Sequence, residues 1–114
     1  MARWLPIASL LVAIAAAPPA GADAIDGDWC HKDGRRVFID RPTIVTPGGK
    51  RMEGDYRRHQ FYYTVPGGER DAGSKVAMEQ LDDDTVHVIT GAGPETTVKG
   101  PVQTWHQCRY QPMT

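Results

Sequence analysis

The two cysteines constrain the fold of this chain more than any other feature. Cys30 and Cys108 are the only cysteines among 114 residues, and they lie near the two ends of the chain once an N-terminal leader is set aside. A domain of about 90 residues has a thin core and is expected to need such a staple. If the two pair, the loop they close contributes about 4 to 5 kcal/mol in the chain-entropy description. A reactive or intermolecular thiol is the alternative.

The first 24 residues have the layout of a secretory signal peptide. Arg3 gives a charged start, residues 4–17 are uncharged and mostly apolar, and two overlapping Ala-x-Ala sites allow cleavage after Ala22 or Ala24. The apolar run is too short to cross a membrane, which takes about 20 residues. We therefore expect a periplasmic or secreted protein, not stably inserted in a membrane after cleavage, with one domain at residues 25–114. Compartments outside the cytoplasm permit disulfides. A retained apolar anchor is the alternative.

Short segments rich in Val, Ile, Thr, Tyr and Phe follow, separated by glycine and proline, and none keeps a helical period over three turns. Eight or nine strands of this kind predict an all-β, antiparallel up-and-down meander of about eight strands, closed as a small barrel; a β-sandwich is the alternative. The expected strands are Ile25 to His31, Arg36 to Asp40, Thr43 to Thr46, Arg51 to Tyr56, His59 to Val65, Ser74 to Leu81, Thr85 to Thr90, Thr96 to Lys99 and Gln103 to Tyr110.

Two of the expected turns have the same sequence pattern. Pro47-Gly48-Gly49 and Pro66-Gly67-Gly68 each follow a strand and precede a charged pair. Proline presets the first turn position, and glycine accepts the positive φ that follows. We interpret them as equivalent turns at one end of the meander; a chance resemblance is the alternative.

The first expected strand carries Gly27-Asp28-Trp29, which resembles the G-x-W motif of the calycins, the superfamily of lipocalins, avidins and related up-and-down barrels. In those proteins an arginine from the last strand packs across the tryptophan at the closed end of the barrel. Arg109 occupies the matching place, so the resemblance implies a stack of Trp29 and Arg109. Side chains alternate along a strand, so Cys30 and Cys108 would then both face outward and could pair. The leader, the Trp-Cys start and the Trp-x-x-Cys end are also similar to small exported proteins of proteobacteria, a group that offers no function to transfer.

No motif for catalysis or metal binding stands out. Ser74 is the only serine after the leader and lacks the nucleophile-elbow pattern, and no H-x-H or H-E-x-x-H spacing joins any of the four histidines. Asp82-Asp83-Asp84 lacks the alternation of a calcium loop and predicts a hairpin tip. We therefore expect no enzyme activity, no cofactor and no metal. A net charge of −1 does not favour nucleic acid as a partner.

One stretch combines arginine with tyrosine in the manner of a recognition surface. Arginine offers paired donors and cation–π stacking, and tyrosine offers rigid amphipathic area, so the pair suits anionic or aromatic partners. A core strand preceded by a charged loop is the alternative. The candidate binding residues are Tyr56, Arg57, Arg58, His59 and Tyr62.

These observations predict a non-enzymatic exported binding module, expected to be a monomer. It would use either the mouth of the barrel or the surface of residues 56–63, and its partner would be a protein or a small anionic or aromatic ligand. An inhibitor of a secreted hydrolase, such as lysozyme or a protease, is one alternative. An envelope structural or stress protein without a small ligand is the other.

Overall fold

The computed structural model describes residues 24–109, so the predicted signal peptide, except Ala24, lies outside the described residues. These residues form nine strands in one antiparallel sheet. The strands are β1 (Gly27–Cys30), β2 (Arg36–Asp40), β3 (Thr43–Val45), β4 (Arg51–Glu53), β5 (Asp55–Arg57), β6 (Gln60–Thr64), β7 (Lys75–Asp82), β8 (Thr85–Gly91) and β9 (Val102–Gln107). Within residues 24–109, no helix is long and apolar enough to cross a membrane.

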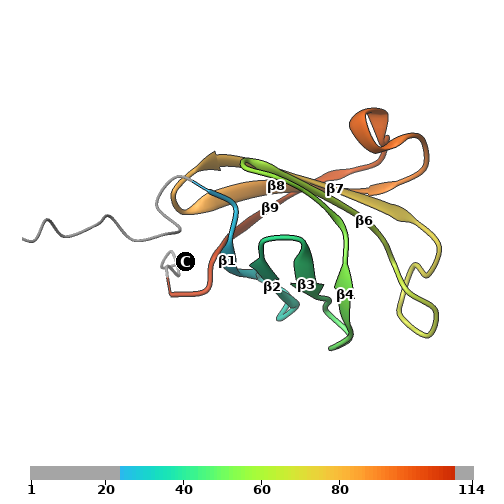
Figure 1. The fold of residues 1–114 in the computed structure, drawn as a ribbon, viewed down its shortest axis with the longest axis horizontal. Helices are drawn as coiled ribbons and strands as arrows, with labels where there is room; N and C mark the ends of the chain where they lie inside the picture. Colours follow the sequence, from blue (N-terminus) through green and yellow to red (C-terminus); the bar gives the residue numbers. More distant parts are fainter. Residues whose placement is uncertain (1–23, 110–114) are drawn as a thin grey trace, which may run out of the picture.

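The sheet curls into a nearly closed barrel (Figure 1). Its strand order is β4-β3-β2-β1-β9-β8-β7-β6-β5, so consecutive strands pair with each other except β4 and β5, and β9 returns to β1. The outermost strands, β4 and β5, are separated in the chain by Gly54 alone. They are therefore two halves of one bent strand that joins the two edges of the sheet. The predicted all-β meander is confirmed, in its barrel form.

Gly54 allows this strand to bend. Its amide donates to the carbonyl of Pro42 at 2.8 Å. A Cβ atom here would lie 2.5 Å from Phe61 Cε1 and 2.6 Å from the carbonyl oxygen of Tyr62, well inside contact distance. The bend therefore requires a residue without a side chain.

Gly54→Ala is expected to lower the free energy of unfolding by about 1 to 3 kcal/mol, the usual cost of overpacking. Urea unfolding measures it. Gly67→Ala is the matched control, because a Cβ there would meet nothing within 4 Å. Equal effects of the two substitutions would show that the bend tolerates a side chain.

The prediction of a strand from Thr96 to Lys99 is wrong. This part of the β8–β9 connection forms the short 3-10 helix η2 (Glu95–Thr97). The amide of Thr97 donates to the carbonyl of Pro94 at 2.9 Å, and only one isolated bridge, Ala92 to Lys99, resembles sheet pairing. The turn residues on either side outweigh the β-propensity of Thr and Val.

Alternate side chains of the strands fill the barrel. The inward positions are buried, whereas Lys75 and Glu79 on the opposite face of β7 are exposed, as the alternation of side chains along a strand requires. The buried core consists of Ile25, Trp29, Val37, Ile39, Ile44, Phe61, Tyr63, Val65, Val76, Met78, Val86, Val88 and Trp105.

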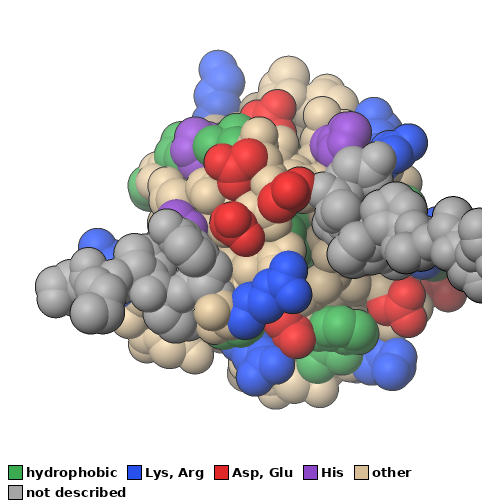
Figure 2. Space-filling view, turned by 90° about the vertical axis from the view of Figure 1, so that its left-hand side faces the viewer, with side chains coloured by type: hydrophobic (Ala, Val, Ile, Leu, Met, Phe, Trp, Pro, Cys, Tyr) green, Lys and Arg blue, Asp and Glu red, His purple; other side chains and the backbone are tan. Residues whose placement is uncertain are grey.

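One end of the barrel is closed by the segment that precedes β1. Trp29 is fully buried, and its indole Nε1 donates to the carbonyl of Ile25 at 2.8 Å. The amide of Ile25, itself fully buried, donates to the carbonyl of Arg58 at 2.8 Å, in the β5–β6 turn. Two hydrogen bonds thus hold this segment across the closed end. Figure 2 faces this end and shows acidic side chains gathered beside basic and histidine side chains.

The predicted disulfide between Cys30 and Cys108 is present, with the two Cα atoms 4.9 Å apart. It joins the regions of the first and last strands, where Cys30 lies opposite His106 in the β1–β9 register. The amide of Cys108 also donates to the carbonyl of Asp28 at 3.1 Å. The covalent link therefore lies at the seam that closes the meander.

Candidate functional site

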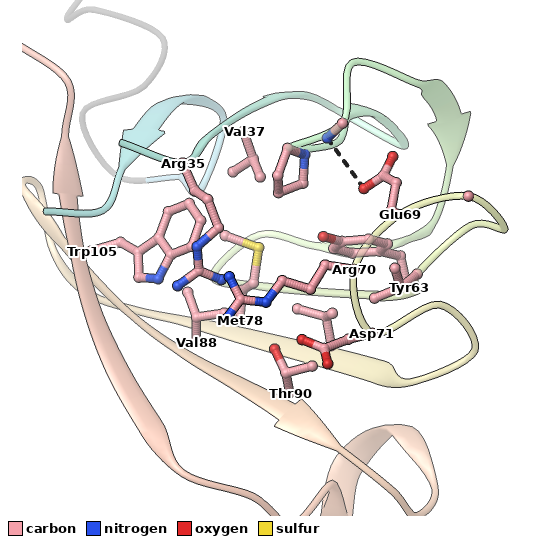
Figure 3. Close-up of a pocket in the computed structure, with 15 residues that line it drawn as sticks. Arg35, Val37, Tyr63, Glu69, Arg70, Asp71, Met78, Val88, Thr90 and Trp105 are labelled. Carbon is pink, nitrogen blue, oxygen red and sulfur yellow. Dashed lines mark hydrogen bonds between the residues drawn. The ribbon is translucent and has the colours of Figure 1, made fainter. Parts of the chain in front are cut away.

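The end opposite Trp29 holds a cavity of about 410 Å³, which we call the barrel cavity (Figure 3). Connections β1–β2, β3–β4 and β6–β7 form its mouth, and β2, β6, β7, β8 and β9 form its walls. Its lining consists of Arg35, Val37, Pro47, Gly48, Tyr63, Val65, Gly68, Glu69, Arg70, Asp71, Val76, Met78, Val88, Thr90 and Trp105.

The walls are apolar and their largest side chain is Trp105. This tryptophan is 2% exposed, and its indole Nε1 donates to Gln103 Oε1 at 3.1 Å. Four valines and Met78 complete the apolar surface. The inner walls of the cavity are thus formed by apolar side chains, among them a tryptophan whose ring is held in place by a hydrogen bond.

Arg35 lies at the mouth, over that ring. Its guanidinium carbon is 5.2 Å from the centre of the Trp105 ring. Its Nε donates to Asp33 Oδ2 at 2.8 Å, and its Nη2 donates to Gln103 Oε1 at 3.1 Å. Nη2 also lies 3.4 Å from Nδ1 of His31, whose ring is 5.3 Å from that of Trp105. These contacts, from the β1–β2 connection and from β9, fix the orientation of the guanidinium.

Asp33 is the counter-charge of this group. Desolvation acts to raise the pKa of Asp33, but hydrogen bonds from the Arg35 amide and from the His31 and Arg35 side chains outweigh it and hold that pKa well below its ordinary value. The carboxylate therefore stays ionised in neutral solution. It balances Arg35 from outside the cavity, because Asp33 does not line it.

Glu69 ties two sides of the mouth together. Its Oε2 accepts from the Thr46 hydroxyl at 2.5 Å, and its Oε1 accepts from the Gly48 amide at 3.2 Å. A Cβ atom at Gly48 would lie 2.4 Å from the Glu69 side chain, so glycine is needed for this approach. Both Pro-Gly-Gly turns therefore lie at the same end of the barrel, as the sequence pattern predicts.

Tyr63 projects into the cavity from β6. The residue is 8% exposed, and Figure 3 shows its hydroxyl pointing toward the middle of the space. The hydroxyl has no hydrogen-bond partner among residues 24–109. Burial raises the pKa of Tyr63 far above its ordinary value, and the nearby Glu69 charge adds to this. The phenol is therefore neutral and can donate to a bound molecule.

Arg70 and Asp71 come from the long β6–β7 connection, and both are exposed. In Figure 3 the Arg70 side chain reaches across the cavity toward Arg35, whereas the Asp71 carboxylate points toward Thr90. Within the described part of the chain, the Arg70 guanidinium has no hydrogen-bond or ion-pair partner. The mouth thus carries one arginine held by neighbours and one that is not.

The structure separates the candidate binding residues of the sequence analysis and places none of them in the barrel cavity. Tyr56 packs against the core, with its hydroxyl 2.5 Å from Asp26 Oδ1. Arg57 lies on the outer face, 5.3 Å from the centre of the Tyr62 ring. The last two, Arg58 and His59, are exposed in the β5–β6 turn, at the opposite end from the cavity. A binding role for these five residues stays a prediction.

The stack implied for Trp29 and Arg109 also stays a prediction. Trp29 is buried at the closed end as expected, and Arg109 is exposed in the turn after β9. The arginine that does lie over a tryptophan is Arg35, on Trp105. Sequence reasoning missed this pair and the roles of Tyr63 and Arg70. Their distance from the glycine turns is a sequence signal that could have found most of them. Arg35, Tyr63 and Arg70 each lie within four residues of a glycine in a turn at the mouth.

A smaller hollow of about 250 Å³ lies where β4 diverges from β6. Asp55 and Glu95 both line it. The hydrogen bond between the two carboxyl groups, and then the hydrogen bond from Arg57, lower the pKa of Asp55. The hydrogen bond from Asp55 raises the pKa of Glu95.

Among residues 24–109, no three His, Cys, Asp or Glu side chains lie together in a way that could hold a metal ion.

Comparisons with protein-family models, with curated proteins and with solved structures each return no match for this chain. The class that the fold and site define is therefore a structural one: a small, disulfide-linked, nearly closed antiparallel β-barrel with a cavity at one end.

Proposed function

We propose that this protein is a non-enzymatic binding module that takes one small molecule into the barrel cavity. The observation that carries the proposal is the cavity itself, about 410 Å³, with apolar side chains in its walls and charged side chains at its mouth. Ligand pockets have volumes of about 300 to 1,000 Å³ and combine apolar walls with polar groups that orient the ligand. A barrel of about eight strands is wide enough to hold one small ligand.

The resemblance to the calycins supports the same proposal. The meander closes between its first and last strands, the tryptophan of the G-x-W motif is buried at the closed end, and the cavity lies at the other end. A calycin-like barrel exported from the cell would suit capture of a small molecule. A hydrolase inhibitor or an envelope structural protein would have no use for an apolar cavity, so these alternatives rank behind.

The neutral dye N-phenyl-1-naphthylamine tests the proposal, because its emission rises in an apolar site. We expect saturable binding of about one dye per protein. Thr90→Trp is expected to weaken binding at least tenfold, because Thr90 lines the cavity near its mouth and indole would occupy the space.

Thr104→Trp is the matched control. Thr104 is exposed and precedes Trp105 on β9, so its side chain is on the outer face of the barrel and the same substitution leaves the cavity open. Circular dichroism should show that both variants are folded. Absence of saturable binding by the wild-type protein, or equal binding by the two variants, would refute the proposal.

A further inference from the structure

We propose that the ligand of the barrel cavity carries an anionic group, of the carboxylate or sulfonate class, bound at the mouth by Arg35 and Arg70, with an apolar body held between the walls of the cavity. This inference rests on the proposed function and specifies the chemistry of the molecule that the cavity takes. It uses Tyr63 from β6 but none of the candidate binding residues Tyr56, Arg57, Arg58, His59 and Tyr62, which do not line the cavity.

The hydrogen-bond inventory of Arg35 leaves donors for such a group. A guanidinium has five N–H donors. The Nε donor is used by Asp33, and Nη2 faces Gln103 and His31. The two donors of Nη1 have no partner among residues 24–109. Because the guanidinium lies over Trp105 and is held on its other edge, a ligand anion would meet donors that are already oriented.

Arg70 would supply the second half of the anion site. It lines the cavity, has no partner within residues 24–109, and reaches toward Arg35 in Figure 3. Two guanidinium groups facing one space repel each other until an anion lies between them. Arginine also binds carboxylate-like groups through paired, charge-assisted hydrogen bonds. A bound anion would therefore relieve the repulsion between the two guanidinium groups and accept hydrogen bonds from both.

The acidic groups at the mouth do not favour a cation instead. Both oxygens of Glu69 already accept hydrogen bonds, from Thr46 and Gly48. Asp71 is exposed and points toward Thr90 in Figure 3. By contrast, the groups directed at the cavity without partners in the described chain are donors: Nη1 of Arg35, the Arg70 guanidinium and the neutral Tyr63 hydroxyl. One of these donors belongs to a buried residue, one to a half-buried residue and one to an exposed residue, and all three suit a ligand that accepts hydrogen bonds.

Two dyes with the same aromatic body test the inference. 8-Anilinonaphthalene-1-sulfonate differs from N-phenyl-1-naphthylamine only by its sulfonate group. We expect the wild-type protein to bind the sulfonate dye about five to ten times more tightly than the neutral dye at low salt. This ratio should fall as salt is added, because the charges lie near the surface and are screened.

Arg70→Gln is expected to lower the ratio of the sulfonate-dye affinity to the neutral-dye affinity about fivefold. Arg51→Gln is the matched control, because Arg51 is an exposed arginine on β4 that does not line the cavity. Both residues are exposed, so thermal unfolding should show the two variants to be as stable as the wild type.

The outcomes separate this inference from the proposed function. If neither dye binds the wild-type protein, the proposed function fails. If both dyes bind the wild-type protein with equal affinity, the cavity binds small molecules but the anion site is refuted. If the sulfonate dye is preferred and Arg70→Gln keeps the full preference, the assignment to Arg70 is wrong.

Discussion

Replacing both Cys30 and Cys108 with serine is expected to lower the free energy of unfolding by about 3 to 4.5 kcal/mol. The disulfide closes a sequence separation of 78 residues, and the chain-entropy description gives about 4.5 kcal/mol for a loop of that length. Small domains have a total stability of about 5 to 15 kcal/mol, so the loss is a large fraction of the whole.

The position of the disulfide explains why little else can replace it. Only two residue pairs join β1 to β9, Trp29 with Gln107 and Cys30 with His106, whereas five pairs join β8 to β9. The seam that closes the meander is therefore short in hydrogen bonds and depends on the covalent link. Without that link the barrel should open at this seam before it opens elsewhere.

Urea unfolding of three samples measures the effect: the oxidised wild type, the reduced wild type and the double serine variant. The reduced wild type and the variant should agree with each other. Arg36→Ala is the control on the other side of β1, where Arg36 of β2 lies opposite Cys30. It removes an exposed ion pair to Asp28, 3.1 Å long, and should cost less than about 1 kcal/mol. A serine variant as stable as the oxidised wild type would contradict the prediction.

Local sequence signals predict the parts of this fold that depend on local physics. Alternation separates buried valines from exposed charges in β2 and β7, and from half-buried side chains in β8, because the side-chain period of a strand is two. The pairing of Cys30 with Cys108 follows from having two cysteines in a chain whose N-terminal residues predict export. The up-and-down order follows from short connections, which make consecutive strands neighbours.

The errors arise where tertiary contacts decide the local structure. The segment from Thr96 to Lys99 has residues typical of a strand, yet the turn that begins at Pro94 makes it a 3-10 helix and connection. The expected strand from Arg51 to Tyr56 is interrupted at Gly54. Its first half, β4, pairs with β3, and its second half, β5, pairs with β6. The bend between the halves requires glycine, because a Cβ atom at this position would clash. The only local sequence signal for the 3-10 helix is Pro94, and the only one for the bend is Gly54.

The candidate site was harder to predict than the fold for a related reason. Residues 56–63 are rich in arginine and tyrosine in sequence, but alternation sends Tyr56 inward and Arg57 outward. The cavity instead combines side chains that are far apart in the chain, such as Arg35, Arg70 and Trp105. Only the closure of the barrel brings them to one mouth, and that closure depends on both cysteines and on Trp29.

Trp29→Ala is expected to lower the free energy of unfolding by about 3 to 5 kcal/mol, the range for truncating a large buried aromatic side chain. Trp29 is fully buried at the closed end, away from the cavity, so no existing space can absorb the change. The truncation also removes the indole donor that holds the carbonyl of Ile25 at 2.8 Å. Ile25 is fully buried, and its amide donates to the carbonyl of Arg58. Losing the indole donor therefore removes one of the two hydrogen bonds that hold this segment across the closed end.

A pair of phenylalanine substitutions isolates the hydrogen bond from the lost volume. Trp29→Phe leaves a buried main-chain carbonyl unpaired, which costs about 1 to 3 kcal/mol. Trp105→Phe removes a similar ring area, but the partner of its indole is the Gln103 side chain, which also accepts from Arg35 and can turn. Trp29→Phe should therefore be the more destabilising of the two by about 1 to 3 kcal/mol in urea unfolding, and only Trp105→Phe should change the affinity of the cavity for a dye. Equal losses of stability would mean that Trp29 acts through its volume alone, and that the Ile25 hydrogen bond does not hold the closed end.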